Sequence, residues 1–147
     1  MVYIRRCSIN EIRYDVRAER MIAAYAAECS IPDAQPQWDA YKAMEDSGVL
    51  VCFAADVDYN LVGFVSVIVA RMPHHGKLVA TVESIYASPE YREEGAGNQL
   101  MAAAEKFARG QGCVCLTYTA RVGSRLETIL ALRAGCERSH EMFTKWF

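Results

Sequence analysis

A short turn near the middle of the chain has the composition of an anion-binding site. Residues 92–97 read Arg-Glu-Glu-Gly-Ala-Gly; an apolar run, 78–87, precedes them, and apolar residues at helical spacing follow from Leu100 to Ala108. The first N–H groups of a helix have no partner within the helix, the helix dipole is positive there, and glycine lets a ligand approach the backbone. The sequence therefore predicts a phosphate or pyrophosphate site between a strand and a helix.

Glu83 is the second residue whose position suggests chemistry. It stands in the middle of the apolar run Val-Ala-Thr-Val-Glu-Ser-Ile-Tyr-Ala (79–87), where an unpaired buried carboxylate would be costly. Partial burial would raise its pKa toward the range useful for a general base, acting directly or through water. A structural carboxylate, paired with an arginine or bound by backbone N–H groups, is the alternative, and the sequence favours neither.

Two other phosphate-binding motifs fit this turn less well. A Walker loop ends in Gly-Lys-Ser/Thr, but Gly97 is followed by Asn98 and Gln99. The dinucleotide-binding fingerprint needs a third glycine, and Leu100 occupies its position. A turn that merely connects a strand to a helix is the structural alternative.

The elements that must position these residues are expected within a single domain of residues 1–147. With 52% hydrophobic residues, the chain is long enough to bury a core. Periodicity and turn residues predict strands at 3–9, 49–57, 61–71, 78–87 and 113–120, and helices at about 18–29, 38–46, 100–108 and 124–135. The tail, 136–147, has a strand-like pattern, and irregular loops are expected at 30–37 and 72–77.

Composition argues against several classes of protein. The formal net charge of −2 gives no attraction for nucleic acid or membranes. No apolar run is long enough for a membrane span, and the first residues lack the hydrophobic segment of a secretory signal. The six cysteines lie in apolar runs or without framework spacing, so reduced thiols in a cytoplasmic protein are expected. Cys113-x-Cys115 is too closely spaced, and too far from a histidine pair, for a zinc site, and no metal is expected.

The turn and the strand before it resemble a known motif. Val-Glu-Ser-Ile-Tyr-Ala (82–87), Ser-Pro-Glu-Tyr (88–91) and Arg-x-x-Gly-x-Gly (92–97) together resemble the acetyl-coenzyme A motif of the GNAT superfamily of N-acetyltransferases. The resemblance implies the α+β (α/β/α) GNAT acyl-CoA N-acyltransferase fold, with a mixed central sheet that splays between strands 4 and 5. It also implies that acetyl-coenzyme A is the co-substrate and that the acetyl group passes directly to a primary amine in a ternary complex.

The resemblance assigns the coenzyme contacts by motif position. The pantetheine arm would hydrogen-bond to the backbone of the strand, and the turn would hold the pyrophosphate. The strand residues are Ile85, Tyr86 and Ala87, and the turn residues are Arg92, Glu93, Glu94, Gly95, Ala96 and Gly97. Ser124 stands where the family often has an asparagine that contacts the coenzyme; a helix N-cap, in a capping box with Glu127, is the favoured alternative.

The catalytic residues match the family less closely. The most common base position holds Thr81, which shares a strand face with Glu83, so Glu83 is the expected base. The usual general acid is a tyrosine on the last helix, where this chain has Ala131; Tyr118 or solvent would then protonate the thiolate. No cysteine has the neighbouring base that a nucleophile needs. A non-catalytic coenzyme A-binding or interaction module is the alternative function, and a nucleotide-binding regulator is a third.

The residues on the acceptor side do not identify the acceptor. By fold analogy, Trp38, Tyr41 and the loop 31–37 would form its wall, although an aromatic pair on a short helix is also typical of a core. His74 and His75 are expected at the surface, without a role. The expected acceptor is a small-molecule amine or a protein amino group. Because the chain ends in a run of aromatic residues, we also expect a homodimer formed through its last strands.

Overall fold

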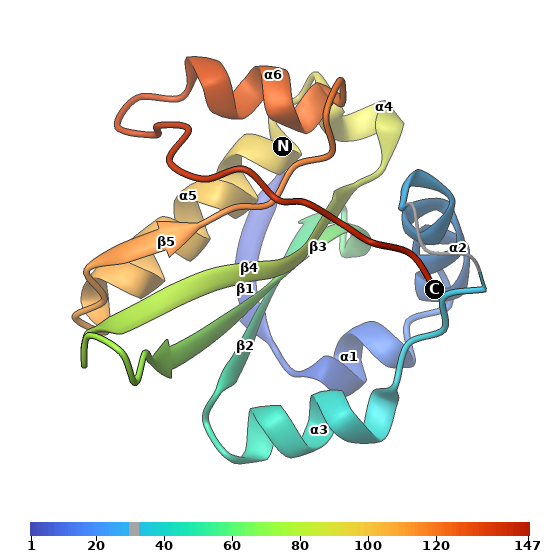
Figure 1. Ribbon diagram of the computed structural model, residues 1–147. Helices are drawn as coiled ribbons and strands as arrows, with labels where there is room; N and C mark the ends of the chain where they lie inside the picture. Colours follow the sequence, from blue (N-terminus) through green and yellow to red (C-terminus); the bar gives the residue numbers. More distant parts are fainter. Residues whose placement is uncertain (30–32) are drawn as a thin grey trace.

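The part of the chain that the structure describes, residues 1–29 and 33–147, forms one mixed five-stranded sheet with helices on both faces (Figure 1). In this computed structural model the strands are β1 (Tyr3–Cys7), β2 (Leu50–Val57), β3 (Asn60–Arg71), β4 (Leu78–Ala87) and β5 (Cys115–Thr117). The helices are α1 (Ile9–Arg13), α2 (Ala18–Glu28), α3 (Trp38–Asp46), α4 (Pro89–Arg92), α5 (Ala96–Gly110) and α6 (Arg125–Leu132).

The strands lie in the sheet in their chain order, β1-β2-β3-β4-β5. Neighbours are antiparallel except β4 and β5, which run parallel. A parallel pair needs a crossover between its strands, and α5 supplies it. The predicted α+β fold class is confirmed.

Each face of the sheet carries an apolar layer. Under α5, the side chains of Leu100, Ala104 and Ala108 cluster with Val65 and Val67 of β3. The opposite layer lies beneath α1, α2 and α3, and its buried members include Ile12, Met21, Leu50, Cys52, Phe64 and Tyr86. Because both faces are covered, β2 and β3 are nearly continuous apolar runs without the alternation of a half-exposed strand.

Most of the predicted elements are confirmed, with changes at their ends. The first strand stops at Cys7 because Ser8 caps the short helix α1, which the sequence analysis did not predict. The turn after β4 contains one helical turn, α4. β5 keeps only three of the residues predicted for it, and α6 ends at Leu132 rather than Gly135.

The prediction of a strand in the tail is wrong, because residues 136–147 contain neither strand nor helix. Aromatic residues favour strands only where a neighbouring strand can pair with them. Of the predicted loop at 30–37, Ser30, Ile31 and Pro32 lie outside the described residues. None of the helices found in the described part of the chain is both long enough and apolar enough to cross a membrane.

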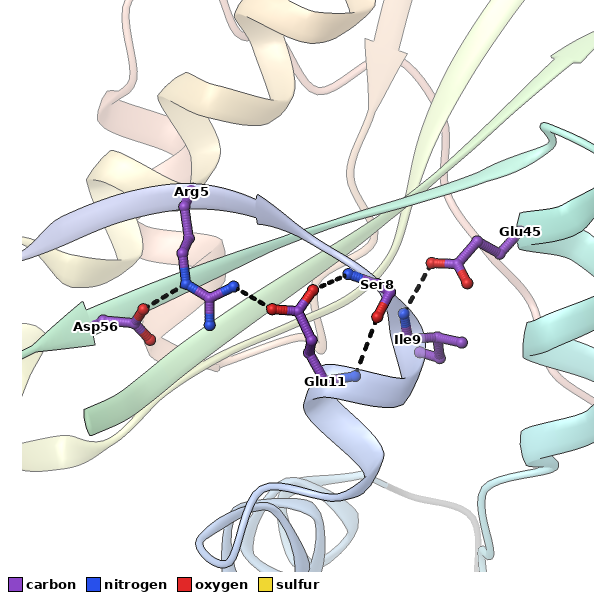
Figure 2. A network of polar contacts seen from close by, with 6 residues as sticks. All are labelled: Arg5, Ser8, Ile9, Glu11, Glu45 and Asp56. Carbon is purple, nitrogen blue, oxygen red and sulfur yellow. Dashed lines mark hydrogen bonds and ion pairs between the residues drawn. The ribbon is translucent and has the colours of Figure 1, made fainter. Parts of the chain in front are cut away.

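A network of charged groups joins β1, β2 and α1 (Figure 2). Arg5 donates through Nε to Asp56 Oδ2 at 2.6 Å and through Nη1 to Glu11 Oε1 at 2.7 Å. Ser8 and Glu11 form a capping box, in which each side chain accepts a hydrogen bond from the other residue's backbone N–H. The bond from Ser8 N–H and the Arg5 guanidinium lower the pKa of Glu11. The network fixes α1 against the edge of the sheet.

The same network reaches α3 through Glu45. The backbone N–H of Ile9, in the first turn of α1, donates to Glu45 Oε1 at 2.8 Å (Figure 2). This bond satisfies one of the free N–H groups at the start of α1. Since Glu45 belongs to α3, the two helices are held together over the sheet face that carries Phe64 and Tyr86.

Gly63 allows β3, β4 and α5 to approach one another closely. It pairs with Ala87 at the end of β4. A Cβ atom added at Gly63 would lie 2.8 Å from the carbonyl oxygen of Tyr86 and 3.2 Å from Cδ1 of Leu100. Only a residue without a side chain fits there, and the first turns of α5 consequently lie against the end of β4.

Candidate active site

β4 and β5 separate part of the way along their length. They pair only where Val79, Ala80 and Thr81 face residues 115–117. At the last pair, the hydroxyl oxygens of Thr81 and Thr117 are 2.9 Å apart. β4 then continues to Ala87 with no strand on its β5 side among the residues that the structure places. The splay predicted between strands 4 and 5 is therefore present.

The edge of β4 beyond the splay presents free backbone groups. Ser88 N–H donates to Val62 O at 2.8 Å, so alternate residues before it, including Tyr86, direct their backbone groups toward β3. The residues between them, Ile85 and Ala87, direct theirs toward the splay. The carbonyl of Ala87 is used, because it accepts a hydrogen bond from Arg92 Nε at 2.8 Å. Of the three strand residues predicted to bind coenzyme, Ile85 and Ala87 have backbone groups facing the splay, and Tyr86 does not.

The N-terminus of α5 lies at the end of this edge. Gly95 precedes the helix with a φ of 85°, a left-handed conformation that favours glycine. Within residues 1–29 and 33–147, no hydrogen bond uses the N–H groups of Ala96, Gly97 or Asn98. A Cβ atom added at Gly97 would meet nothing within 4 Å. Three unpartnered donors at the positive end of a fifteen-residue helix fit an anion.

Two of the three charged side chains of the turn, Arg92 and Glu93, have structural partners. Arg92 binds the carbonyl of Ala87 and, through Nη2, Glu28 Oε1 of α2 at 2.9 Å. Glu93 Oε1 accepts from Arg125 at 2.6 Å and is largely exposed. These side chains hold the turn against β4, α2 and α6, and the groups left for a ligand belong to the backbone.

Ser124 acts as the N-cap of α6. Its Oγ accepts a hydrogen bond from Glu127 N–H at 3.2 Å. The Glu127 carboxylate accepts from Gly123 N–H and not from Ser124, so the predicted capping box is only half formed. The ion pair between Arg125 and Glu93 places the start of α6 beside the turn. Ser124 thus lies near the predicted coenzyme site with its hydroxyl already used as a cap.

Glu83 is the extra residue of a β-bulge. Ser66 pairs with Ser84 and Val67 pairs with Val82, so Glu83 has no partner on β3. A bulge breaks the alternation of faces, and Glu83 and Ser84 both lie on the face covered by α1, α2 and α3. Sequence alternation alone would have placed Ser84 beneath α5.

Glu83 is exposed, so the expectation of a buried or partly buried carboxylate is wrong. Hydroxyl groups hold its carboxylate. Tyr41 OH of α3 donates to Oε1 at 2.8 Å, and Ser66 Oγ donates to Oε2 at 2.5 Å. Ser66 Oγ also lies 2.6 Å from Ser84 Oγ, and both serines are buried. Burial and the bond to Glu83 raise the pKa of Tyr41, so its hydroxyl remains a donor at neutral pH. None of the ion pairs formed by the described residues includes Glu83.

A cavity of about 170 Å³ lies between this sheet face and the three N-terminal helices. Apolar and aromatic side chains make up most of its wall, among them Ile9, Ile22, Tyr25, Trp38 and Phe64. Tyr41, Ser66 and Ser84 also line it, so the groups that bind Glu83 are part of its surface. Of the predicted acceptor wall, Trp38, Tyr41 and residues 34–36 line the cavity, and Ile31 and Pro32 lie outside the described residues.

The family model named Acetyltransferase (GNAT) family matches residues 16–127. The chain belongs to the GNAT family. The match runs from just before α2 to the start of α6, and so includes the splay, the turn at 92–97 and the Glu83 bulge. The protein is therefore an acyltransferase, an enzyme of the N-acetyltransferase class, as the resemblance implied.

Individual relatives of this GNAT enzyme are named for different acceptors. The aminoalkylphosphonate N-acetyltransferase of Salmonella typhimurium is 28% identical over 112 residues, which cover 71% of this chain and 73% of that protein. A solved aminoglycoside acetyltransferase from an uncultured soil metagenomic sample, in complex with sisomicin, has a TM-score of 0.77 at 16% identity, covering 99% of this chain and 96% of that one. The ribosomal-protein-alanine N-acetyltransferase of Brucella melitensis has a TM-score of 0.75 at 20% identity and covers 99% of both chains. At such identities the two structures establish the fold.

Tyr118 lies on the other side of the sheet from Glu83. It packs against the apolar layer under α5, and its hydroxyl donates to Glu105 Oε1 at 2.8 Å. Burial and this bond raise the pKa of Tyr118, while the bidentate Arg133 guanidinium lowers that of Glu105. The structure does not bring Tyr118 and Glu83 together, and Ala131, at the usual tyrosine position, is exposed.

The two histidines lie away from the splay. His74 and His75 are exposed in the loop before β4, at the opposite end of that strand from Ala87. Their rings contact each other, with centroids 4.3 Å apart. No group of three or more His, Cys, Asp or Glu residues in the described ranges could hold a metal ion.

Sequence reasoning missed the two serines that contact Glu83 or its neighbour. Ser66 and Ser84 each interrupt an apolar strand, and a hydroxyl in a strand buried on both faces needs a partner. That signal was available in the sequence. Their contact with each other was not, because it depends on the register of β3 against β4.

Proposed function

We propose that this GNAT enzyme transfers the acetyl group of acetyl-coenzyme A to a primary amine by direct transfer in a ternary complex. The observation that carries the proposal is the position of Glu83. Its carboxylate lies on the α1–α3 face, bound to two residues that line the cavity, in the part of β4 that borders the splay. A carboxylate between a coenzyme site and an acceptor cavity is well placed to remove a proton from an amine.

The groups around the splay fit acetyl-coenzyme A, which supplies a thioester-activated acetyl group. The N–H groups of residues 96–98 would bind its pyrophosphate, and the open space beside Gly97 leaves room for it. Ile85 and Ala87 would pair with the pantetheine arm along the free edge of β4. A nucleotide would use only the first of these two features, so ATP should fail to displace coenzyme A in a competition titration. Displacement by ATP would instead favour a nucleotide-binding regulator.

Glu83 would accept the proton that an acceptor ammonium must lose before its nitrogen attacks the thioester carbonyl. The C–N bond then forms as the C–S bond breaks, and an ammonium and a thioester together give an amide, a thiol and one proton. Tyr41 and Ser66 each fix one carboxylate oxygen, which orients the base and limits its motion. Tyr118 or solvent is the proposed source of the proton taken up by the sulfur.

Direct transfer needs no cysteine nucleophile. Burial raises the pKa of Cys7 and of Cys52 to about 12, so both are thiols at neutral pH. Cys29 lines the cavity and is the thiol best placed for a covalent route. We expect Cys29→Ala to keep its turnover and initial-rate plots to intersect when both substrates are varied. Parallel plots, with loss of activity in Cys29→Ala, would show an acetyl-cysteine intermediate instead.

Glu83→Gln tests the proposed base. The change keeps the shape of the side chain but removes the proton acceptor, so turnover should fall on the order of 10²-fold with coenzyme A affinity unchanged. The fall in rate at acidic pH should disappear as well, because that fall reports protonation of the base. Glu19→Gln, an exposed glutamate on α2, is the matched control and should behave like the unmodified enzyme.

The outcomes separate three roles for Glu83. If the residue is structural, Glu83→Gln lowers the melting temperature and leaves turnover per folded molecule intact. If the protein is a non-catalytic coenzyme A-binding module, coenzyme A binds but neither form acetylates any amine in a broad panel. Melting temperature, coenzyme affinity and turnover are therefore measured on the same preparation.

A homodimer is a further part of the proposal. Met142, Phe143, Trp146 and Phe147 are exposed in the tail, and a second copy of the chain would cover them. Analytical ultracentrifugation at micromolar concentration should show a dimer that Phe143→Ser with Trp146→Ser weakens. A monomer would reject this part without affecting the proposed reaction.

A further inference from the structure

The wall of the cavity beside Glu83 is almost entirely uncharged. Its lining residues within the described ranges include no Lys, Arg, His, Asp or Glu side chain. The polar side-chain groups of the lining residues are few: the hydroxyls of Tyr25, Tyr41, Ser66 and Ser84, the amide of Gln35, the indole N–H of Trp38 and the thiol of Cys29. The hydroxyls of Tyr41, Ser66 and Ser84 are already engaged with Glu83 or with one another. The remaining wall is aliphatic and aromatic.

From this wall we infer that the acceptor is a small primary amine with an uncharged, apolar body about the size of one aromatic ring. The inference rests on the proposed function, because it takes the cavity as the acceptor site. An apolar cavity of about 150 Å³ can hold benzene, and this cavity measures about 170 Å³. Trp38 and Phe64 offer it aromatic surface, and Ile9 and Ile22 offer aliphatic surface.

The carboxylate fixes which end of the acceptor is polar. The ammonium binds Glu83, beside Tyr41 and Ser66, where the proton is removed. The rest of the molecule then extends into the apolar part of the cavity and is removed from water. Amine and body lie at opposite ends of the acceptor, separated by a short linker.

Two polar acceptor chemistries fit this wall poorly. A phosphonate would bring its negative charge into a cavity with no cation among the described lining residues, which carries a large desolvation cost. An aminoglycoside would bring several ammonium and hydroxyl groups, and each one left without a partner is costly to bury. The relatives named for such acceptors therefore share the fold of this enzyme and not its specificity.

A matched series of amines tests the inference with the purified, full-length enzyme. 2-Phenylethylamine, ethanolamine and 2-aminoethylphosphonate share one aminoethyl group and differ only in the body attached to it. We expect kcat/KM for 2-phenylethylamine to exceed that of the other two on the order of 10- to 100-fold, the range expected for burying one aromatic ring. Equal or better use of ethanolamine or the phosphonate would overturn the inference and leave the proposed reaction standing.

Substitutions on α2 test whether this cavity determines which acceptor bodies the enzyme accepts. Ala26 lines the cavity and Ala27 is its exposed neighbour on the same helix. Ala26→Leu should fill the space and raise KM for 2-phenylethylamine about tenfold or more, with little change for ethanolamine. Ala27→Leu should leave KM unchanged for both amines. Ile22→Ala enlarges the cavity and should raise kcat/KM for tryptamine, the larger amine, relative to that for 2-phenylethylamine. This variant replaces Ala26→Leu as the test if Ala26→Leu folds poorly. Unchanged selectivity in both cavity variants would overturn the inference.

Calorimetry separates failure of the inference from failure of the proposed function. With coenzyme A present, 2-phenylethylamine should bind the unmodified enzyme and Ala27→Leu, and bind Ala26→Leu weakly. The same binding pattern without acetyl transfer to any amine would support the cavity assignment and reject the proposed reaction. Absence of 2-phenylethylamine binding to the unmodified enzyme would overturn the inference, whatever the transfer assays give.

Discussion

The two halves of the candidate site are built from different parts of the chain. On the coenzyme side, the donors are backbone N–H groups of residues 96–98 and the free edge of β4, and all come from one continuous segment. On the acceptor side, the cavity is made of side chains from α1, α2, α3, β3 and β4, with loop residues between the helices. A backbone site needs mainly glycine at the right spacing. A side-chain cavity needs several distant elements to pack in one arrangement.

The strongest test of this contrast is Gly97→Val. A Cβ atom there meets nothing within the protein, so the fold should survive with a melting temperature close to that of the unmodified enzyme. The added methyl groups would occupy the space proposed for the pyrophosphate. Since a hydrogen bond to a charged group contributes about 1.5–3 kcal/mol, losing one should weaken coenzyme A binding about 10- to 150-fold.

Glu93→Ala and Glu94→Ala are the matched controls for that experiment. Their side chains belong to the same turn, but a backbone site does not use them, and isothermal titration should show coenzyme A affinities within about twofold of the original. Equal losses from the glutamate and glycine variants would mean that side chains, not the backbone, bind the coenzyme. The contrast between the two halves would then disappear.

The acceptor side should instead respond to a single hydroxyl group. Tyr41→Phe removes one of the two hydrogen bonds to the Glu83 carboxylate and keeps the aromatic ring in the cavity wall. A base held by one bond is less well oriented, and kcat should fall about tenfold with coenzyme A affinity unchanged.

Ser66→Ala removes the other bond and should give the same pattern, with additional destabilisation because Ser84 loses its partner. A destabilised protein whose kcat is unchanged would show that the hydroxyl groups support the fold only. In that case Glu83 would act, if it acts at all, without the help of its neighbours.

The success of sequence analysis follows the same division. The strand 78–87 has the predicted ends, and the turn and the helix after it were predicted, because all three lie in one stretch whose apolar spacing and glycines determine local structure. The helix begins at Ala96 rather than at about Leu100, so its start was placed too late. The bulge at Glu83 was not predicted, since it arises from how β4 aligns with β3. α1 was missed because a helix of five residues depends on Ser8, Glu11 and the contact from Glu45 more than on periodicity.

Glu105→Gln tests a third region, the layer under α5, through the pH dependence of the free energy of unfolding. The Arg133 guanidinium lowers the pKa of Glu105 below the value of about 4.3 expected in the unfolded chain. A carboxylate with a lowered pKa stabilises the folded state above the unfolded pKa, and the contribution is lost as pH falls through the folded pKa. At pH 7 the variant should be less stable by about 1 kcal/mol, a value kept small by partial exposure. The difference in denaturant midpoint should shrink as pH falls below the unfolded pKa and vanish once Glu105 is protonated in the folded state, and a difference of constant size across this range would reject the ion pair as its cause.

Tyr118→Phe is expected to have the smallest effect, and it decides whether the region under α5 belongs to the site. The hydroxyl donates to Glu105, so its loss should cost about 1 kcal/mol of stability. The proposal that Tyr118 protonates the departing sulfur predicts more: a fall in kcat of at least about tenfold. Tyr118→Phe combined with Glu105→Gln separates the two, because a purely structural hydroxyl adds little once its partner is changed. A large kcat loss in Tyr118→Phe with a normal melting temperature would mean that the tyrosine leaves Glu105 and turns toward the splay during the reaction. Normal turnover with the small loss of stability would leave solvent as the proton donor and confine the chemistry of this enzyme to the α1–α3 side of the sheet.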